Sequence, residues 1–418
     1  MSKNDLVVVT GAGGFIGGHL VRVLQQRGHT KIRAVDVKPL NEWYQKTPGV
    51  ENQVGDLALL EPCRAAAKGA KMIYNLAADM GGMGFIEIHK ADCLLSVLIS
   101  THMLVAAKEV GTERFFYSSS ACVYNADKQT RVDVTALKEE DAYAAIAEDG
   151  YGWETLFSER MARHFREDYG IATRVARYHN VYGPEGTYDG GREKAPAAIC
   201  RKVIAAKLSG KDKIEILGDG EQTRSFMYID DCIDGTIRLA QSDIIEPLNI
   251  GSDELVSINR LVDIVEKIAG VKLERSYKLD APLGVRGRNS DNTLIKKLMG
   301  WAPSIRLEDG MEKTYKWIYD EMTSGKASVV NALPPLSRPG SALHIRTARL
   351  KSTGCGSGDR PASPAGCWRR PLHVRTPVSA ELMPAPRRPA HRHSAPSSGG
   401  LSAERWKWLV RNPEGVRS

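Results

Sequence analysis

The sequence predicts an α/β fold built on a doubly wound parallel sheet, and two patterns carry this prediction. Short apolar, β-branched runs alternate with helical patterns through residue 178, which is typical of parallel strands covered by helices on both faces. After residue 178 the pattern loosens into loops and shorter elements. A chain of 418 residues is long enough for two core-forming regions. We therefore expect a smaller second domain after the sheet.

The first strand is predicted at residues 6–10, and a glycine-rich turn follows it directly. The turn reads Gly11-Ala12-Gly13-Gly14-Phe15-Ile16-Gly17 and leads into a helix through residue 24. Glycines at its first, fourth and seventh positions allow a tight turn, a close backbone approach to a pyrophosphate, and close packing of the helix on the strand. The sequence therefore predicts a dinucleotide site at Gly11, Gly14, Phe15, Ile16 and Gly17.

The second strand, residues 31–35, ends in Asp36. A carboxylate there accepts hydrogen bonds from both hydroxyls of the adenosine ribose and repels a 2′-phosphate, so the expected cofactor is NAD rather than NADP. Asp56 and Leu57 follow a third strand and are candidates to cover the adenine. For Asp56, a role as the N-cap of the next helix is the alternative.

Later elements complete the expected organisation. Strands are predicted at 72–75, 114–118 and 173–177, helices at 90–110 and 153–168, a strand and turn at 214–220, and a helix near 258–269. The predicted domains are a Rossmann-like NAD-binding domain at 1–178 and a smaller α/β substrate domain at 179–326, from which part of the sheet can also be completed. A substrate is expected between the two, at the carboxyl ends of the strands.

Residues 327–418 form the third predicted part, a basic tail rich in proline and arginine. From residue 335 onward, 15 Lys and Arg stand against 4 Asp and Glu, together with 11 of the 20 prolines. The apolar residues show no sustained period, so the tail is predicted to be disordered, with a short helix at 406–410. The formal net charge is +8, so residues 1–334 carry −3, which gives no reason to expect nucleic acid.

The sequence also indicates the cellular compartment. The chain shows no signal peptide and no uninterrupted 18-residue apolar run, so a cytoplasmic protein without a membrane partner is expected. Seven cysteines without CxxC spacing indicate reduced thiols and no metal site. Four of them stand in apolar helical contexts and are expected to fill the core: Cys63, Cys93, Cys200 and Cys232.

Candidate catalytic groups stand at the end of the predicted strand at 114–118. Ser120 and Cys122 present a hydroxyl and then a thiol, Tyr151 follows after a short gap, and Lys194 lies in the run 190–198. A hydroxyl, a phenol, a thiol and an ammonium in one pocket can perform redox chemistry and proton transfer. The alternatives are a buried filler for Cys122, a core aromatic for Tyr151 and a solvated lysine for Lys194.

Residues 5–325 resemble the extended short-chain dehydrogenase/reductase family of nucleotide-sugar epimerases and dehydratases, and within it the branch that epimerises GDP-mannose. Five runs in order carry the resemblance: 75–86, 119–122, 190–198, 220–226 and 284–292. The resemblance implies an isomerase that oxidises C4 of the sugar, exchanges the protons at C3 and C5, and reduces C4 again. Sister dehydratases carry a glutamate at the position of Cys122, and four-epimerases a small hydroxyl residue.

The resemblance also assigns roles to residues. Tyr151 would take the C4 hydroxyl proton while Ser120 holds that oxygen, and Cys122 and Lys194 would be the acid/base pair of epimerisation. The positions that match the family's nucleotide-sugar contacts are Gly81, Ser120, Ala121, Cys122, Asn180, Glu193, Lys194, Ala195, Lys202, Gln222, Thr223, Arg224 and Arg288. The cations among them, Lys202, Arg224 and Arg288, suit the two phosphates of a GDP-sugar. Arg286 is an alternative to Arg288. The alternative to phosphate binding is that these arginines are ordinary surface residues.

One position departs from the family pattern. The fourth residue after Tyr151 is Thr155, where the family has a lysine that bonds the nicotinamide ribose and lowers the pKa of the tyrosine. Threonine can still contact the cofactor ribose but supplies no charge. Two alternatives to the epimerase therefore stay open: a nucleotide-sugar 4-epimerase or dehydratase, and a catalytically impaired homologue that binds NAD and nucleotide sugar.

The family also implies a homodimer, in which the helices at 90–110 and 153–168 pair with their copies as a four-helix bundle. Apolar residues on these helices would supply the seam: Leu94, Leu95, Leu98, Met103, Leu104, Leu156, Phe157 and Met161. Packing within one subunit is the alternative for many of them.

Overall fold

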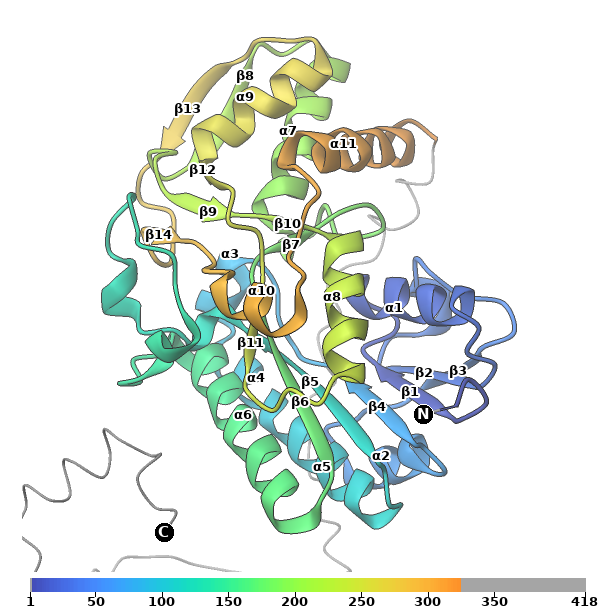
Figure 1. The fold of residues 1–418 in the computed structure, drawn as a ribbon. Coiled ribbons are helices and arrows are strands. Elements are labelled where there is room, and N and C mark those ends of the chain that lie inside the picture. The colour runs from blue at the N-terminus through green and yellow to red at the C-terminus, as the bar shows by residue number, and fades with distance from the viewer. Residues whose placement is uncertain (1, 325–418) are drawn as a thin grey trace, which may run out of the picture. The chain divides into compact units, whose positions relative to one another are not determined.

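The computed structural model describes residues 2–324. Within them, seven strands form one parallel sheet in the order β11-β6-β5-β4-β1-β2-β3 (Figure 1). The bounds are β1 (Val7–Thr10), β2 (Ile32–Asp36), β3 (Glu51–Val54), β4 (Met72–Asn75), β5 (Arg114–Ser120), β6 (Ala172–Tyr178) and β11 (Leu248–Ile250). The predicted doubly wound sheet is confirmed. The predicted tail at 327–418 and the helix at 406–410 lie outside the described residues.

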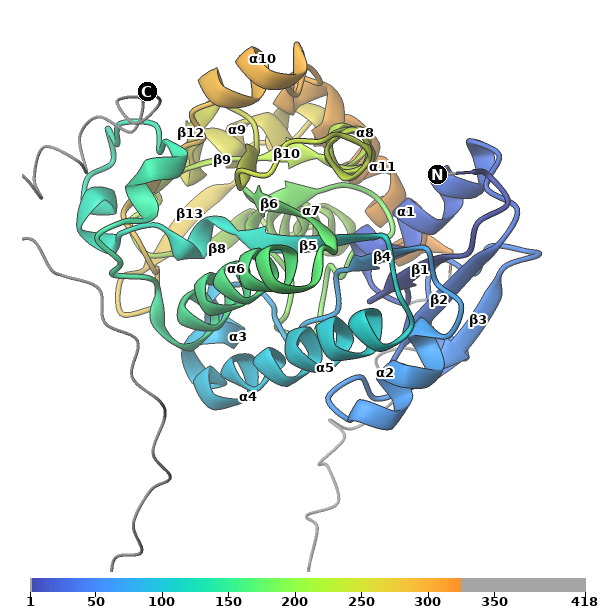
Figure 2. The same cartoon turned by 60° about the horizontal axis from the view of Figure 1, so that its bottom comes forward.

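Both faces of the sheet are buried, which explains the continuous apolar runs of its strands. Val7 and Val9 belong to the core on one face, while Val8 belongs to the core on the other. The first face carries α1 (Phe15–Gln26) and α8 (Ile229–Gln241), and the second carries α2 (Leu60–Ala67), α5 (Ser96–Glu109) and α6 (Asp149–Tyr169), as Figure 2 shows.

Two helix predictions need correction. The helix predicted at 90–110 is divided at Leu95 into α4 (Lys90–Leu94) and α5. The helix predicted to begin at 153 begins at Asp149 and therefore includes Tyr151. Its glycines signal close packing rather than a loop, because a Cβ on Gly150 would lie 2.4 Å from the Lys90 carbonyl oxygen, and one on Gly152 would lie 2.4 Å from that of Cys122.

The expected dimer seam also needs correction. Met103, Leu104 and Leu156 are buried in the core of the subunit, so these three residues stabilise its own fold. Leu94, Leu95, Leu98 and Phe157 are exposed. The four cysteines expected in the core are all buried, which confirms that prediction.

The remaining elements are short and come mostly from residues 179–324. They form the pairs β7 (Val181–Tyr182) with β10 (Met227–Tyr228) and β8 (Lys213–Leu217) with β13 (Glu274–Lys278), and the three-stranded sheet of β12 (Leu255–Ser257), β9 (Thr223–Ser225) and β14 (Gly287–Arg288). The helices are α3 (Met83–Ile88), α7 (Ala195–Ser209), α9 (Ile258–Ala269), α10 (Thr293–Met299) and α11 (Leu307–Thr323). Short 3₁₀ turns are η1 (Leu40–Glu42), η2 (Ala121–Val123), η3 (Ala126–Gln129) and η4 (Glu139–Ala142).

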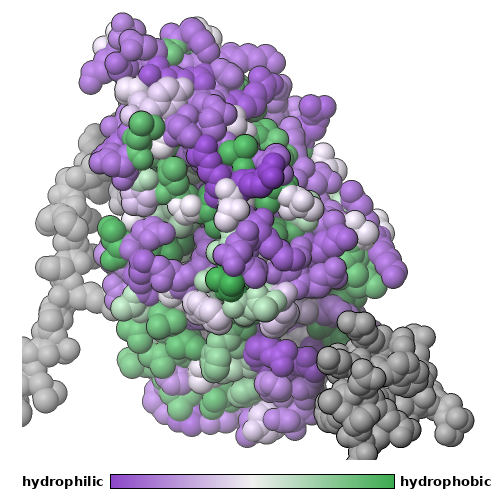
Figure 3. Space-filling model, turned by 90° about the vertical axis from the view of Figure 1, so that its left-hand side faces the viewer, coloured by the Kyte–Doolittle hydropathy of each residue, from purple (hydrophilic) through white to green (hydrophobic). Residues whose placement is uncertain are grey.

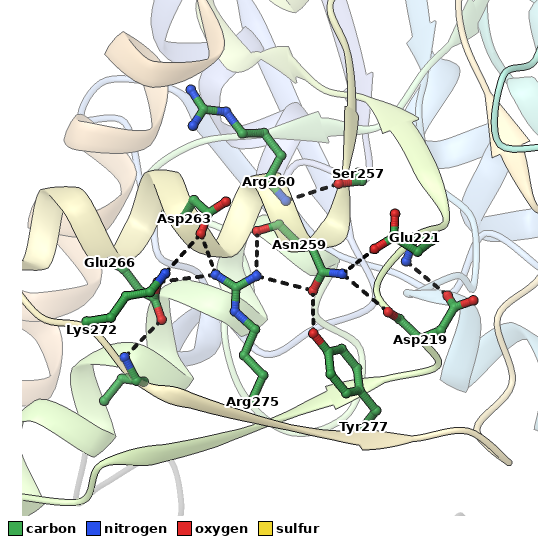
Figure 4. A network of polar contacts seen from close by, with 11 residues as sticks. Asp219, Glu221, Ser257, Asn259, Arg260, Asp263, Glu266, Lys272, Arg275 and Tyr277 are labelled. Atoms are coloured by element: carbon green, nitrogen blue, oxygen red, sulfur yellow. Dashed lines mark hydrogen bonds and ion pairs between the residues drawn. The ribbon is translucent and has the colours of Figure 1, made fainter.

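A polar network joins α9 to β13 in this second region (Figure 4). The Arg275 guanidinium donates to Asp263 at 2.5 Å and to the buried Glu266 at 3.2 Å. Asn259 donates to Glu221 at 2.7 Å, in the turn that follows β8. Because buried charges are tolerated when paired and hydrogen-bonded, the network holds β8, β13 and α9 in one layer beside the strands that carry the candidate phosphate-binding arginines.

Candidate active site

The turn between β1 and α1 has the geometry that a dinucleotide pyrophosphate needs. Gly11 adopts a φ of +68°, and a Cβ on Gly17 would lie 2.1 Å from the Gly11 carbonyl oxygen, so α1 packs directly on the turn. No side chain caps the N-terminus of α1 at Gly14. Free amides and the helix dipole therefore favour an anion there, and Phe15 and Ile16 form the first residues of the helix.

Asp36 lies at the end of β2, beside this turn. Its Oδ2 accepts a hydrogen bond from the Gly13 amide at 3.0 Å, and its Oδ1 accepts one from the Lys38 amide at 3.0 Å. Asp56 accepts from the Ala58 amide at 3.0 Å, whereas α2 begins after Leu59, so the N-cap alternative for Asp56 is wrong. Leu57 is buried. These residues fit a bound NAD, with the carboxylate at the adenosine ribose.

We expect NAD⁺ to bind about tenfold or more tightly than NADP⁺, which corresponds to about 1.4 kcal/mol. The Asp36 carboxylate would repel a 2′-phosphate. Among nearby cations, Arg33 is engaged with Glu51 at 3.0 Å, and Lys38 Nζ lies 3.4 Å from the Gly13 carbonyl oxygen. Calorimetric titration with both cofactors measures the ratio, and Asp36→Asn should narrow it. Equal binding by the unsubstituted protein would refute the prediction and direct attention to Lys38.

The catalytic candidates converge where β5 ends. Ser120 is its last residue, and the Ser120 hydroxyl accepts a hydrogen bond from the Cys122 amide at 3.2 Å. Cys122 and Tyr151 are both buried in one small cluster that also contains Phe85, Ile86 and Cys93. The neighbouring Ser119 donates to the buried carboxylate of Glu159.

Tyr151 lies in the first turn of α6, where its phenol is difficult to ionise. Burial raises the pKa of its phenol, as do nearby Cys122 and Glu154, whereas the hydroxyls of Ser120 and Thr155 lower it. No cation of the described residues appears among these influences. The Thr155 hydroxyl donates to the Tyr151 carbonyl oxygen at 2.6 Å and lies 3.2 Å from Glu154 Oε2, so it acts locally and supplies no charge.

Lys194 immediately precedes α7 as its N-cap residue. Burial lowers the pKa of its ammonium, and the charge of Cys122 acts in the opposite direction. Burial thus favours the neutral amine, and a neutral amine can accept a proton. The structure therefore brings Lys194 into the electrostatic neighbourhood of the thiol, as general acid/base chemistry requires.

Arg224 is a partly buried cation without a carboxylate among the described ion pairs. Its guanidinium donates to the carbonyl oxygens of Thr223 at 2.8 Å, Leu283 at 3.1 Å and Val285 at 2.6 Å, and burial lowers its pKa to about 10. The pairing of β9 with β14 places Arg288 directly beside it. A partly buried guanidinium without a carboxylate partner favours a bound anion.

Arg288 is oriented toward the thiol. It forms an ion pair with Glu148, donates to Gln129 Oε1 at 2.7 Å, and places Nη1 3.6 Å from Cys122 Sγ. Its proposed alternative, Arg286, is engaged with Asp219 at 2.6 and 2.8 Å and lowers the pKa of that carboxyl to about 2. Arg288 therefore lies at the centre of the site and Arg286 is held elsewhere.

The other predicted substrate residues have these places. Lys202 donates to the Glu215 carbonyl oxygen at 2.8 Å, Asn180 to that of Ser225 at 3.1 Å, Gln222 to that of Leu217 at 2.9 Å, and Thr223 to that of Val132 at 2.5 Å. Gly81 adjoins Phe85, Ala121 is buried in η2, Glu193 accepts from Arg201 at 3.2 Å, and Ala195 begins α7. Three residues of the site were missed from the sequence: Glu148, Glu154 and Arg192.

Glu154 is a buried carboxyl directly behind the catalytic tyrosine. It accepts hydrogen bonds from Ser158 at 2.9 Å and Thr155 at 3.2 Å. Burial raises its pKa to about 7, against the lowering effect of hydroxyls from Ser158, Thr155 and Tyr117. The sequence signal was a charged residue on the buried face of α6, one position before Thr155.

Glu154→Gln should change stability in a pH-dependent way. A carboxyl whose pKa is raised by folding stabilises the protein below about pH 4.5 and loses that contribution as the pH rises through about 7. Glutamine has no carboxyl to ionise. The free energy of unfolding of the variant, relative to that of the unsubstituted protein, should therefore increase by about 3 kcal/mol as the pH rises from 4.5 to 7. Thermal unfolding of both proteins from pH 5 to 8 measures this, with exposed Glu167→Gln as control. A difference that does not vary with pH would contradict the assignment.

Comparison with known proteins agrees with the fold and the site. The model of the NAD dependent epimerase/dehydratase family matches residues 7–251. GDP-mannose 3,5-epimerase of Arabidopsis thaliana is 46% identical over 78% of this chain and 85% of its own length. GDP-mannose 3,5-epimerase 1 of Oryza sativa subsp. japonica is 46% identical over 79% and 86%.

Solved structures show the same architecture. UDP-glucose 4-epimerase from Thermotoga maritima superposes with a TM-score of 0.68 at 23% identity, over 76% of this chain and 99% of that one. MoeE5, solved with UDP-glucose and NAD, gives 0.63 at 28% identity over 76% and 99%. Fold and site thus define an NAD-dependent enzyme with a Rossmann-like sheet. The chain belongs to the NAD dependent epimerase/dehydratase family.

Proposed function

We propose that this chain converts GDP-mannose to GDP-L-galactose by inverting the sugar at C3 and C5. The plant relatives that it resembles over most of its length carry the name of this activity. The observation that carries the proposal is the placement of a thiol beside the tyrosine: Cys122 and Tyr151 share one buried cluster. Lys194 is close enough to Cys122 for their charges to interact.

Different residues of the site would perform different steps of this reaction. Bound NAD⁺ supplies the hydride acceptor and donor at C4. Tyr151 accepts the C4 hydroxyl proton, and Ser120 at the end of β5 holds that oxygen. A C4 ketone makes the neighbouring C–H protons acidic, so Cys122 and Lys194 can then remove and return protons at C3 and C5.

The nucleotide part of the substrate explains the two adjacent arginines. A diphosphate would neutralise Arg224, whose guanidinium is engaged only with carbonyl oxygens. Arg288, beside it on β14 and 3.6 Å from Cys122 Sγ, links the phosphate side of the site to the thiol. Arginine suits this role because its donors match the oxygens of a phosphate.

Incubation of the protein with NAD⁺ and GDP-mannose in deuterated water tests the proposal. We expect deuterium at C3 and C5 and a product with both centres inverted. Inversion at C4 without label at C3 or C5 would identify a 4-epimerase, and loss of water a dehydratase. Tight binding of NAD⁺ and GDP-mannose without any label would identify a binding protein. Each of these three outcomes overturns the proposal.

We also propose that the chain acts as a homodimer, through an apolar surface on α4, α5 and α6 that we call the helix seam. Its exposed residues are Leu94, Leu95, Leu98, Trp153 and Phe157. Figure 3 shows hydrophobic residues gathered in the lower part of this face, at the height of α4 to α6 in Figure 1. Large exposed apolar patches indicate interaction sites, and family members are expected to pair through these helices.

The helix seam also explains why one helical stretch of the protein is unusually apolar. By length and composition, Lys90–Glu109 is apolar enough to cross a membrane, with 39% of the window buried in the protein, although no uninterrupted 18-residue apolar run was expected. Its buried residues cover the sheet and its exposed ones belong to the seam, so we propose a cytoplasmic protein with no membrane partner. The five described cysteines are all free, which suits a reducing compartment.

Phe157→Glu should convert the dimer to a monomer. Phe157 is 55% exposed on α6, so the substitution should not disturb the subunit core but would bury a charge at the seam. Sedimentation at micromolar concentration with NAD⁺ present measures the mass. The control is Tyr169→Glu, at the C-terminal end of α6, where Tyr169 is 50% exposed. A monomeric unsubstituted protein, or a dimeric Phe157→Glu, would refute the seam.

A further inference from the structure

Residues 79–88, which we call the cap, form one wall of the catalytic cluster. Phe85 and Ile86 of α3 are buried in the same cluster as Cys122 and Tyr151, and Met80 packs against it. The cap is attached to the sheet side by the amide of Asp79, which donates to Ser96 Oγ at 2.9 Å. Any movement of the cap would therefore expose the residues of the reaction.

The segment that leads to Lys194 lies directly on the cap. The Gly82 amide donates to the Arg192 carbonyl oxygen at 3.0 Å, and a Cβ on Gly82 would lie 2.5 Å from the Glu193 carbonyl oxygen. Only glycine permits this approach. The backbone of the segment and the backbone of the cap thus form a close interface two residues before Lys194.

The side chain of Arg192 fastens this interface. Its Nη1 donates to Asp79 Oδ1 at 2.7 Å and to the Met80 carbonyl oxygen at 3.2 Å, and its guanidinium lies 3.7 Å from the centre of the Phe85 ring. An ion pair alone at a half-exposed site contributes little. A planar guanidinium that also stacks on an aromatic ring adds orientation that a lysine cannot supply.

On its other side the segment is tied by few contacts. Gly190 and Gly191 precede Arg192 with φ values of +91° and +87°, a Cβ on either would meet open space, and the Gly191 amide donates to Glu193 Oε2 at 2.7 Å. Because glycine has wide backbone freedom, we call Gly190 and Gly191 the hinge. Beyond the hinge, Glu193 is held by Arg201 at 3.2 Å, and Arg192 provides the contact to the opposite wall.

We propose that Arg192 is a positioning residue that clasps the cap and thereby holds the backbone that carries Lys194. Nothing in the reaction needs Arg192 to touch the substrate. Loss of the clasp should release the hinge segment, so that Lys194 becomes accessible to solvent and transfers protons poorly, while Tyr151 and Ser120, held by β5 and α6, still support oxidation at C4. The expected effect of Arg192 on turnover rests on the proposed function, whereas its expected effect on the accessibility of Lys194 does not.

Two measurements on the NAD⁺-bound protein test the clasp separately. Acetylation of Lys194 by an N-hydroxysuccinimide ester, followed by peptide mass spectrometry, should be about fivefold or more faster in Arg192→Ala, in keeping with the loss of burial. Asp79→Asn should give the same direction. Arg163→Ala is the matched control, because Arg163 is similarly exposed and pairs with Glu167 at 2.7 Å on the outer side of α6.

Turnover gives the second readout. With GDP-mannose in deuterated water, formation of the inverted, labelled product by Arg192→Ala should fall about tenfold or more relative to NADH formation, and Arg192→Lys should recover only part of it. Unchanged acetylation of Lys194 in both Arg192→Ala and Arg192→Lys overturns the clasp. If the unsubstituted protein shows no label at all, the proposed function fails, and the acetylation experiment alone still decides the clasp. Arg192→Lys serves for both readouts if Arg192→Ala does not fold.

Discussion

Replacing Thr155 by lysine should raise epimerase turnover by about a hundredfold or more, within the 10² to 10⁴ range of general-base contributions. Tyr151 is difficult to ionise, since burial raises its pKa and the hydrogen bonds that lower it come from the uncharged Ser120 and Thr155 hydroxyls. The phenol of a free tyrosine has a pKa near 10, and bringing it to about 7 requires about 4 kcal/mol. A threonine hydroxyl supplies no charge and also donates to the Tyr151 carbonyl oxygen.

The new ammonium would enter a site suited to a cation. Glu154 lies next to position 155 and has a pKa raised to about 7 by burial. A lysine nearby would favour its ionised form, so Glu154 would balance the new charge while the ammonium stabilises the phenolate. The pH optimum of C4 oxidation should therefore move downward in Thr155→Lys.

Thr155→Met is the matched control, because methionine is long and apolar and brings no charge. NADH absorbance after addition of GDP-mannose measures C4 oxidation, and label from deuterated water measures the later steps. A gain with lysine but not with methionine supports the electrostatic argument. Equal turnover in all three proteins would mean that Tyr151 does not limit the reaction, and an absence of NADH from all three would mean that this pocket does not oxidise GDP-mannose.

The cofactor end of the site was predictable residue by residue because its constraints are local. A pyrophosphate beside a helix N-terminus requires glycines at fixed spacing, and the carboxylate of Asp36 follows one strand later; both lie within 36 residues of the N-terminus. Parallel strands were also predictable, because burial on both faces leaves continuous apolar runs such as Val7–Thr10.

The substrate end depends on contacts that no short pattern encodes. Arg288 and Cys122 are 166 positions apart, and neither sequence segment indicates that Glu148 would pair with the arginine. The role of Arg192 could not be predicted from the sequence, because its partners Asp79 and Phe85 are more than 100 positions away in the chain. The helix predicted from 153 begins four residues earlier, at Asp149, and its glycines at 150 and 152 allow α6 to approach the carbonyl oxygens of Lys90 and Cys122.

Substitution of Cys122 or Lys194 should abolish inversion while preserving C4 oxidation. Inversion at a carbon needs one group to remove the proton and another to return it on the opposite face, so loss of either should lower epimerisation by about 10² to 10⁴. The group that remains can still remove and return a proton on its own face. We therefore expect Cys122→Ser and Lys194→Met to incorporate deuterium with retention of configuration, and both to form NADH at a rate close to that of the parent protein.

The controls for this last experiment lie in the same structure. Cys93→Ala removes another buried thiol from the cluster that contains Cys122, and Lys207→Met removes a lysine from the far end of α7, where its ammonium donates to the Ala269 carbonyl oxygen at 2.6 Å. Both should leave inversion within about twofold, since neither group takes part in proton transfer. Thr155→Lys is the best parent for all four variants, because faster C4 oxidation makes the proton-transfer steps visible. Full inversion in Cys122→Ser or Lys194→Met would show that another group performs the proton transfer, and loss of NADH formation would show that the two residues act already at C4.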